Sequence, residues 1–295
     1  MLSLWRRLPI IAGAILAGVF VALVGTTPWA VLVSLNTRHW PSLPWAVPPT
    51  ALYLWVLWRY LQGAGWPQST ADARRISCRA NRLPDDVWGA AILAGIVGLA
   101  ALVLLLRVLN RLIVLPPQQD LDPSQFPPTT VLLWVLMGSI VAGVVEEAAF
   151  RGYLQGTIER RHGPVIAILV TGSIFGFAHL THPEVTLVLL PYYLAVAAVY
   201  GVLAYLTNSI LPSLVLHAGG NMLSAFDLFT AGTSEWQAAS SPQALIWQTG
   251  IDTSFVLSAL AALLVGAAAI WAYSKLAAVV RKHEKTRTAN AATSS

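Results

Sequence analysis

Long apolar stretches separated by short polar segments run through almost the whole chain. A helix that crosses the hydrocarbon core of a bilayer needs about 20 mostly apolar residues. Eight stretches reach or approach that length, at residues 9–35, 44–62, 87–107, 129–150, 164–181, 185–206, 209–228 and 253–279. The pattern predicts an all-α fold, a polytopic transmembrane helical bundle of about eight spanning helices.

The composition favours a membrane protein. Hydrophobic residues make up 56% of the chain and charged residues only 11%, whereas soluble domains carry about 25% charged residues. So few charges cannot give a folded chain of 295 residues a wettable surface, and a bilayer removes that need. We therefore expect an integral, multi-pass protein, located in the plasma (inner) membrane if the source is bacterial.

The distribution of basic residues indicates the orientation of the helices. If both termini are cytoplasmic, all but three of the 18 Lys and Arg residues fall on the cytoplasmic side, and only Arg38, Arg107 and Arg111 fall outside. An excess of basic residues in cytoplasmic loops is typical of membrane proteins. The net charge of +5 thus predicts contact with the lipid bilayer rather than with nucleic acid, and an even number of spans.

The polar residues divide the chain into three blocks. Residues 1–115 form apolar helices without deep polar groups, which predicts an anchoring role. A Pro-rich linker follows at 116–128, because prolines this dense interrupt a helix. Residues 128–228 concentrate the intramembrane polar side chains and form the candidate functional core. Residues 229–295 are expected to be an outer loop, a last transmembrane helix and a basic cytoplasmic tail that is disordered.

Glu146 and Glu147 stand at the end of an apolar stretch, where a charged side chain is costly to place in a bilayer. Arg151 lies four residues after Glu147, in the favourable orientation for a helical ion pair. Glu146 points about 100° away around the helix. The pattern predicts that Arg151 keeps Glu147 charged and structural, which leaves Glu146 as the candidate general base. The alternative is that both glutamates mark a helix end at the cytoplasmic membrane edge.

Two further polar pairs occur at four-residue spacing on later stretches. Phe175 and His179 share one helix face, so the ring can pack beside the imidazole. His217 and Asn221 share another face, and the glycines at 219–220 would let a helix or a substrate backbone approach closely. A lone histidine near a helix end is more often structural than catalytic, which is the alternative for His179. The alternative for His217 and Asn221 is an interhelical hydrogen bond, although neither residue type is expected there for packing.

These residue types permit two chemistries. In the first, Glu146 with His179 takes a proton from a water that attacks a peptide carbonyl. His217 and Asn221 would then donate hydrogen bonds to the oxyanion that forms. In the second, Glu146, His179 and His217 hold a Zn²⁺ ion that activates the water. The chain has no H-E-x-x-H run, so the usual zincin geometry is absent.

The motifs follow one another as E-E-x-x-x-R at 146–151, F-x-x-x-H at 175–179 and H-x-x-x-N at 217–221. In this order, on separate apolar stretches, they resemble the CPBP family, the CAAX-protease and bacteriocin-processing (Abi) intramembrane peptidases. The resemblance covers about residues 128–228. It implies an endopeptidase with a cavity open to the cytoplasm, in which Glu146 and His179 activate water. It also implies that His217 and Asn221 form the oxyanion site.

The implied substrate is a membrane-associated peptide or protein, which in eukaryotic relatives is a prenylated CaaX tail. The resemblance allows both a metalloprotease and a metal-independent glutamate protease. We favour the latter, with no cofactor, because only one carboxylate is free and Asn221 suits an oxyanion better than a metal. Two other functions stay open: a non-catalytic immunity or scaffold protein that uses the same cavity, and a proton-coupled transporter, since intramembrane Glu and His also build proton relays.

The depth of these residues in the bilayer is a difficulty for straight helices. With a rise of ~1.5 Å per residue, Glu146 falls near the cytoplasmic side and His179 falls ~22 Å from that side. The two side chains can approach only if the helices tilt strongly or if the fifth helix begins below the membrane plane.

Overall fold

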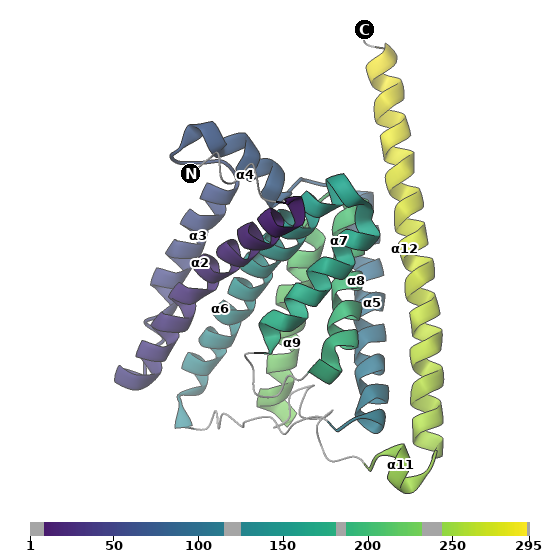
Figure 1. The fold of residues 1–295 in the computed structure, drawn as a ribbon. Coiled ribbons are helices and arrows are strands. Elements are labelled where there is room, and N and C mark those ends of the chain that lie inside the picture. The colour runs from purple at the N-terminus through teal and green to yellow at the C-terminus, as the bar shows by residue number, and fades with distance from the viewer. Residues whose placement is uncertain (1–8, 115–124, 181–186, 232–243, 294–295) are drawn as a thin grey trace.

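The computed structural model describes residues 9–114, 125–180, 187–231 and 244–293, and the regular secondary structure of these residues is helical, without any β-strand (Figure 1). The prediction of an all-α fold is confirmed for this part of the chain. Most of the Pro-rich linker predicted at 116–128 lies outside the described residues.

The main helices are, in chain order, α2 (Ile10–His39), α3 (Val47–Leu61), α4 (Ala71–Cys78), α5 (Asp85–Leu112), α6 (Pro128–Glu146), η3 (Glu147–Gln155), α7 (Gly156–His179), α8 (Leu190–Thr207), α9 (Leu211–Ala231), α11 (Ile246–Thr249) and α12 (Thr253–Thr293). Short 3₁₀ turns, η1 (Gln68–Thr70) and η4 (Leu187–Leu189), precede α4 and α8. Each apolar stretch of the sequence coincides with one of the longer helices.

Five helical stretches within the described residues are long and apolar enough to cross a membrane: Ile10–His39, Asp85–Leu112, Pro128–His179, Leu187–Thr207 and Thr253–Ala289. The stretches predicted at 129–150 and 164–181 both fall within Pro128–His179, because α6, η3 and α7 follow one another and the chain reverses at Gly163 inside α7. α3 has 15 residues and is shorter than a typical span.

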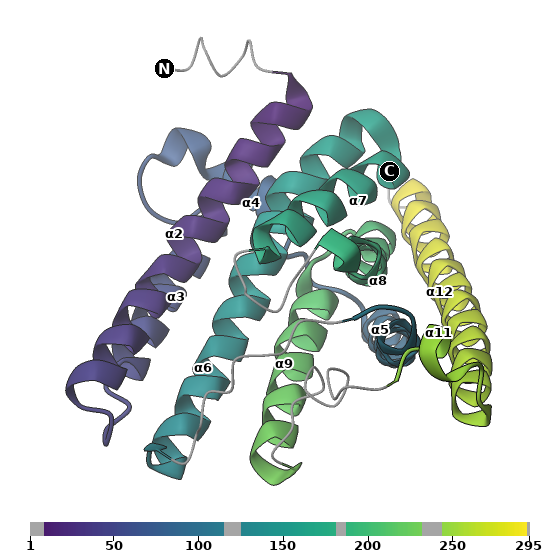
Figure 2. The same cartoon turned by 60° about the horizontal axis from the view of Figure 1, so that its bottom comes forward.

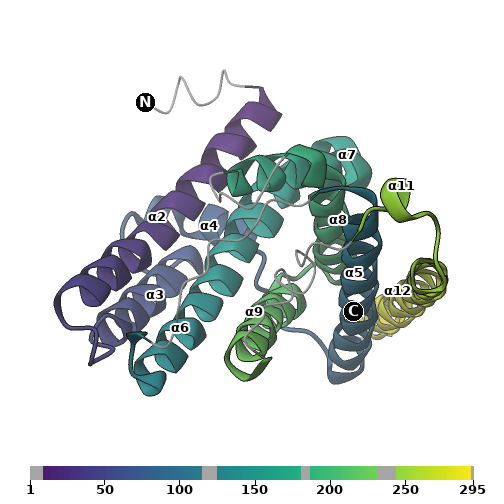
Figure 3. The same ribbon diagram turned by 90° about the horizontal axis from the view of Figure 1, so that it is seen from below.

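The long helices pack side by side. α12 lies along α5, and α5 packs in turn on α8 (Figures 1 and 2). α6 lies beside α9, with α2 and α3 on its other side (Figure 3). Gly143 of α6 permits the close approach to α9, because a Cβ at this position would lie 2.8 Å from the Cβ of Ala218 and 3.0 Å from the carbonyl oxygen of Leu214.

The basic tail continues the last helix, so the expectation of a disordered tail is wrong. α12 remains helical as far as Thr293 and extends beyond the bundle (Figure 1). His283 in this extension contacts Asp86 at the start of α5, which ties the tail to the bundle. The beginning of α2 and the end of α12 lie at the same end of the molecule (Figure 1).

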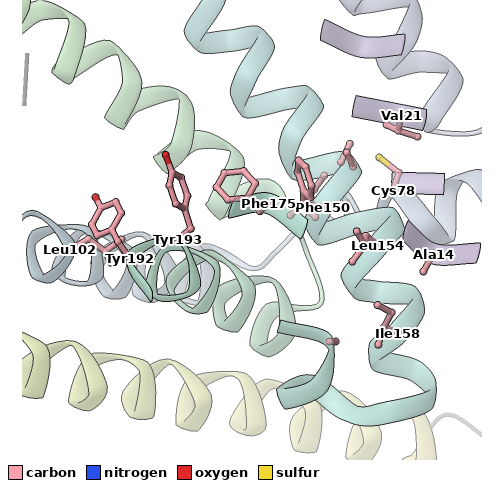
Figure 4. Packing of buried hydrophobic residues seen from close by; sticks show 14 of the residues in the cluster. Ala14, Val21, Cys78, Leu102, Phe150, Leu154, Ile158, Phe175, Tyr192 and Tyr193 are labelled. Carbon is pink, nitrogen blue, oxygen red and sulfur yellow. The ribbon is translucent and has the colours of Figure 1, made fainter. Parts of the chain in front are cut away.

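A buried apolar cluster surrounds η3. Phe150 and Leu154 of η3 pack with Ala14 of α2, Cys78 of α4 and Phe175 of α7 (Figure 4). This packing places a short segment with several polar residues inside the protein instead of in a loop at the membrane edge. The cluster therefore holds the helix that carries the glutamate pair.

Candidate active site

A helical hairpin that turns at Gly163 determines the height of the polar residues along the bundle. The helix that begins at Pro128 continues past the glutamates and reverses at Gly163, whose φ of +79° and ψ of 169° lie outside the helical region. Glycine adopts this conformation without the steric cost that a side chain would add. Arg151 lies twelve residues before Gly163 and Phe175 lies twelve residues after it, and the Arg151 Cζ is 4.9 Å from the centre of the Phe175 ring.

The same register resolves the difference in depth between the glutamates and His179. Glu147 lies sixteen residues before Gly163 and His179 lies sixteen residues after it. The returning half of α7 starts well beyond Glu146, so its sixteenth residue is brought back to the level of the pair. The expectation that the glutamates stand near the end of their helix is wrong, because that helix runs on for about four more turns.

The glutamates stand at the junction of α6 and a π-helical segment. η3 covers Glu147–Gln155 and has wider turns than an α-helix, a feature often found at functional sites. Almost all of its side chains are buried. Gly152 lets η3 approach the end of α4, because a Cβ there would lie 2.7 Å from the carbonyl oxygen of Ser77.

Glu147 is the buried anchor of the site. Its side chain is 0% exposed, and its Oε1 lies 3.1 Å from Nη1 of Arg151, which is also 0% exposed. The same oxygen accepts a hydrogen bond of 2.9 Å from Nδ1 of His217. The guanidinium of Arg151 lies between two aromatic rings, 4.9 Å from the centre of Phe175 and 5.1 Å from that of Tyr200. The carboxylate is thus neutralised by one cation, and the rings shield that cation.

His217 lies between the two glutamates. Because an ionised carboxylate only accepts hydrogen bonds, Nδ1 carries the hydrogen shared with Glu147. The other ring nitrogen, Nε2, lies 3.8 Å from Oε2 of Glu146. The imidazole stacks on Tyr200 with ring centres 5.3 Å apart and an interplanar angle of 14°. The ring is therefore held from one side by a carboxylate and from its face by an aromatic ring, with Nε2 presented to Glu146.

Glu146 differs from its neighbour in its environment. Its side chain is 20% exposed, whereas that of Glu147 is fully buried. Arg151 forms its ion pair with Glu147. The split between a paired glutamate and a more accessible one, predicted from the four-residue spacing, is present in the structure.

His179 lies at the end of α7 against a group of aromatic rings. Its Nδ1 is 2.8 Å from the carbonyl oxygen of Phe175, and since a carbonyl only accepts, Nδ1 carries the hydrogen. Nε2 of the neutral ring therefore bears a lone pair. The imidazole packs 4.3 Å from the centre of the Phe175 ring and 4.9 Å from that of Tyr193. Phe175 joins the two parts of the site, because it contacts both His179 and Arg151; Figure 4 shows it beside Phe150.

Asn221 lies one helical turn after His217, where its side chain is exposed. The glycines between them, at 219–220, do not form the close helix–helix contact that was one of the two roles predicted for them. Among the described residues, no atom lies within 4 Å of a Cβ placed at Gly219 or Gly220, so both positions border open space. The close contact of α9 with α6 is made one turn earlier, at Ala218 and Gly143.

The two tyrosines are members of the site that the sequence does not reveal. Tyr193 and Tyr200 stand in an apolar stretch without a distinguishing motif, and their contacts with His179 and His217 depend on how α8 packs on its neighbours. Both are buried. Their spacing of seven residues, two turns on one face of a helix, is the signal that could have paired them with two histidines.

A family comparison matches this region of the chain. Residues 128–223 match the family described as type II CAAX prenyl endopeptidase Rce1-like. These residues are a domain of the Rce1-like CAAX prenyl endopeptidase (CPBP/Abi) family. The match covers about a third of the chain. No curated protein and no solved structure matches the chain.

The Rce1-like domain contains all of the site residues described above. It begins with α6, ends within α9, and includes η3, α7 and α8, while α2, α5 and α12 pack around it. Membership of this family implies a peptidase acting on a protein or peptide. Together with the five long apolar helices, it makes the protein a multi-pass integral membrane protein.

A zinc site was the alternative use of the same residues. Within the described ranges, His, Cys, Asp and Glu side chains form no group of three or more that could hold a metal ion. Within this part of the chain, Glu146, His179 and His217 are not gathered into such a group, and the mechanism proposed for the protein passes no step through a metal.

Proposed function

We propose that the protein is an intramembrane endopeptidase that hydrolyses a peptide bond in a membrane-associated peptide or protein. The observation that carries the proposal is the position of His217, which is bonded to the buried Glu147 and faces the accessible Glu146. A histidine oriented by one carboxylate and presented to another group is the usual arrangement of hydrolytic sites. The Rce1-like domain supports the same reaction class.

In the proposed mechanism, Glu146 acts with Nε2 of His179 to take a proton from water. The hydroxide oxygen bonds to the carbonyl carbon of the substrate, and the carbon–nitrogen bond then breaks as the proton passes to the leaving amine. One water is consumed, and a carboxyl and an amine group are formed. Glu146 is suited to this role because its side chain is partly exposed and is the less neutralised carboxylate of the pair.

His217 and Asn221 stabilise the oxyanion in this proposal. Because Nδ1 already donates to Glu147, Nε2 can donate to the oxyanion once the ring has taken up a proton. Asn221 supplies a second donor from the next helical turn. The open space beside Gly219 and Gly220 lies between them in sequence and offers a place for the substrate backbone.

The bilayer is the other partner of the proposed enzyme. Large apolar side chains on the outer face of α12 are exposed, including Leu257, Leu263, Leu264, Ile270 and Trp271. The substrate class includes lipidated peptides, as the family description suggests. About eight spans with both termini in the cytoplasm remain our topology, supported by the common end at which α2 begins and α12 finishes (Figure 1).

The decisive test compares membranes that contain the wild-type protein or Glu146→Gln. Proteomic mapping of protein C-termini should reveal a processed product that is present with the wild type and absent with the variant. Glu284→Gln, which changes an exposed residue on α12, is the matched control and should keep the product. If Glu146→Gln retains full biological activity, the peptidase is refuted and the scaffold or immunity function is favoured.

Two further measurements separate the remaining alternatives. Activity that survives metal chelation in a protein without bound Zn²⁺ would eliminate the metalloprotease. Proteoliposomes that dissipate a pH gradient would instead reveal a proton-coupled transporter, which the peptidase should not mimic.

A further inference from the structure

Polar side chains continue from the glutamate pair in steps of four residues along η3 and α7. The row consists of Glu147, Arg151, Gln155 and Glu159, which share one helix face. Gln155 Nε2 donates to Glu159 Oε2 at 3.2 Å, and Glu159 forms an ion pair of 2.8 Å with Arg79. This polar row runs from the site to the end of the bundle where the chain reverses at residue 163.

Most buried polar atoms without a hydrogen bond lie on this row. Within the described residues, the buried side-chain nitrogen and oxygen atoms that lack a hydrogen-bond partner belong to Trp45, Glu146, Glu147, Arg151, Gln155 and Thr171. All except the Trp45 indole nitrogen are on the polar row or next to it. Leaving such atoms unbonded costs about 1–3 kcal/mol each, so a group of them in one place indicates a polar ligand.

Thr171 is the least expected member of this group. Elsewhere in the chain, the hydroxyls of Thr26, Thr50 and Thr207 donate to the carbonyl oxygen four residues earlier, as is usual for threonine in a helix. The Thr171 side chain is 0% exposed, and its Oγ1 has no hydrogen-bond partner among the described residues. Its hydroxyl is therefore available to a group other than its own helix.

The hairpin brings Thr171 to the row. Gln155 lies eight residues before Gly163 and Thr171 eight residues after it. Gly201 of α8 independently shows that Gln155 and this part of α7 lie at the same height along the bundle. A Cβ at Gly201 would lie 2.8 Å from Gln155 Oε1 and 3.0 Å from Cγ1 of Ile168. Ile168 is less than one helical turn from Thr171. Gln155 also donates to the carbonyl oxygen of Gly201 at 2.9 Å.

We propose that Thr171 and the polar row hold a file of internal water molecules that connects the glutamate pair with the end of the bundle at Glu159. The unbonded atoms are complementary for water, since Arg151 offers only donors, Gln155 Oε1 only accepts, and the Thr171 hydroxyl does both. An internal water needs two to four such partners. The presence of these water molecules does not depend on any reaction. The further step, that they supply the water consumed in hydrolysis, rests on the proposed function.

Occupancy can be tested without any catalytic readout. X-ray hydroxyl-radical footprinting of the full chain in lipid nanodiscs modifies buried side chains that lie next to bound water. Phe175 and Tyr200 are 3% and 5% exposed and flank Arg151, so they should be modified despite their burial. Trp134, which is 8% exposed and donates its indole hydrogen to Asn36, is the control away from the row. Phe175 and Tyr200 modified no more than Trp134 would overturn the proposal.

Thr171→Val and Thr171→Ser form a matched pair for the delivery of water. Valine preserves the volume and breaks no hydrogen bond between described groups, so the fold should be kept. We expect Thr171→Val to reduce modification of Phe175 and to lower kcat about tenfold, or ~1.4 kcal/mol, with KM unchanged. Thr171→Ser, which keeps the hydroxyl, should restore both.

The two proposals fail differently. If no processed product depends on Glu146, the peptidase fails while footprinting still decides on the water. If Glu146→Gln abolishes cleavage but Thr171→Val keeps both wild-type kcat and wild-type modification, the water file is wrong and the peptidase stands.

Discussion

Glu147→Gln tests whether the buried ion pair anchors the site. The substitution keeps the shape of the side chain but removes the charge opposite Arg151, and both side chains are 0% exposed. Leaving one partner of a buried pair uncompensated costs about 3–5 kcal/mol. At about 2–4 °C per kcal/mol, Tm should fall by about 10 °C. Activity should be lost as well, because His217 loses the carboxylate bonded to its Nδ1.

A double variant separates the charge from the packing. Glu147→Gln combined with Arg151→Met removes both charges and leaves a side chain that can still fill the space between Phe175 and Tyr200. The double variant should recover much of the lost Tm, with a coupling energy of about 2–3 kcal/mol in the double-mutant cycle. Its activity should stay absent, because the catalytic contact with His217 is not rebuilt.

Thermal unfolding in nanodiscs, followed by tryptophan fluorescence, provides the measurement. Asp72→Asn is the control, because Asp72 and Arg75 form an ion pair of 2.7 Å on the surface with side chains 80% and 64% exposed. Such pairs contribute about 1 kcal/mol or less, so Tm should change by no more than about 4 °C. If Glu147→Gln behaves like Asp72→Asn, or if the double variant is as unstable as the single ones added together, the anchoring role of Glu147 is refuted.

Three other predictions follow from packing and charge. Gly143→Ala should lower Tm, because the added Cβ would crowd α9. Gly220→Ala adds a Cβ that contacts no described atom, so it should raise stability by roughly 0.5–1 kcal/mol. Equal shifts in the unfolding curves of the two variants would contradict this. The Arg111 hydrogen bond lowers the pKa of Asp252 below its ordinary 3.8. The Tm advantage of the wild type over Asp252→Asn should thus be complete above that pH and vanish as the pH falls below it; an advantage that persists in acid would be inconsistent. Burial raises the pKa of the Cys78 thiol to about 12, so maleimide should label it at pH 7 only after denaturation, and rapid labelling of the native protein would disprove its burial.

The helices could be predicted from the sequence because the bilayer requires long apolar stretches, and each stretch coincides with a helix. The hairpin that turns at Gly163 could not be predicted in this way. The segment after Arg151 carries Gln155, Glu159 and several basic residues, a composition that is typical of a loop at the membrane edge. These residues remain helical because their polar groups find partners inside the protein, such as the Arg79–Glu159 ion pair. The Gly163–Pro164 pair was the only local sign of the turn.

The site was predictable where its geometry is local. The contact of Glu147 with Arg151 follows from their four-residue spacing on one helix. The bond from His217 to Glu147 does not, because it depends on the packing of α9 against α6 at Gly143. The role proposed for Thr171 is equally hidden in the sequence, because its hydroxyl differs from those of other helical threonines only in having no hydrogen-bond partner among the described residues.

The distribution of ionisable groups also bears on the choice between a hydrolase and a transporter. A transporter exposes its binding site alternately to both faces of the membrane. Here the polar row continues from Glu147 through Arg151 to Glu159 and its partner Arg79, towards one end of the bundle. Between Pro128 and Glu146, α6 consists of apolar and small polar residues. A site connected to one face suits an enzyme that draws water from that face and cleaves a substrate held in the membrane.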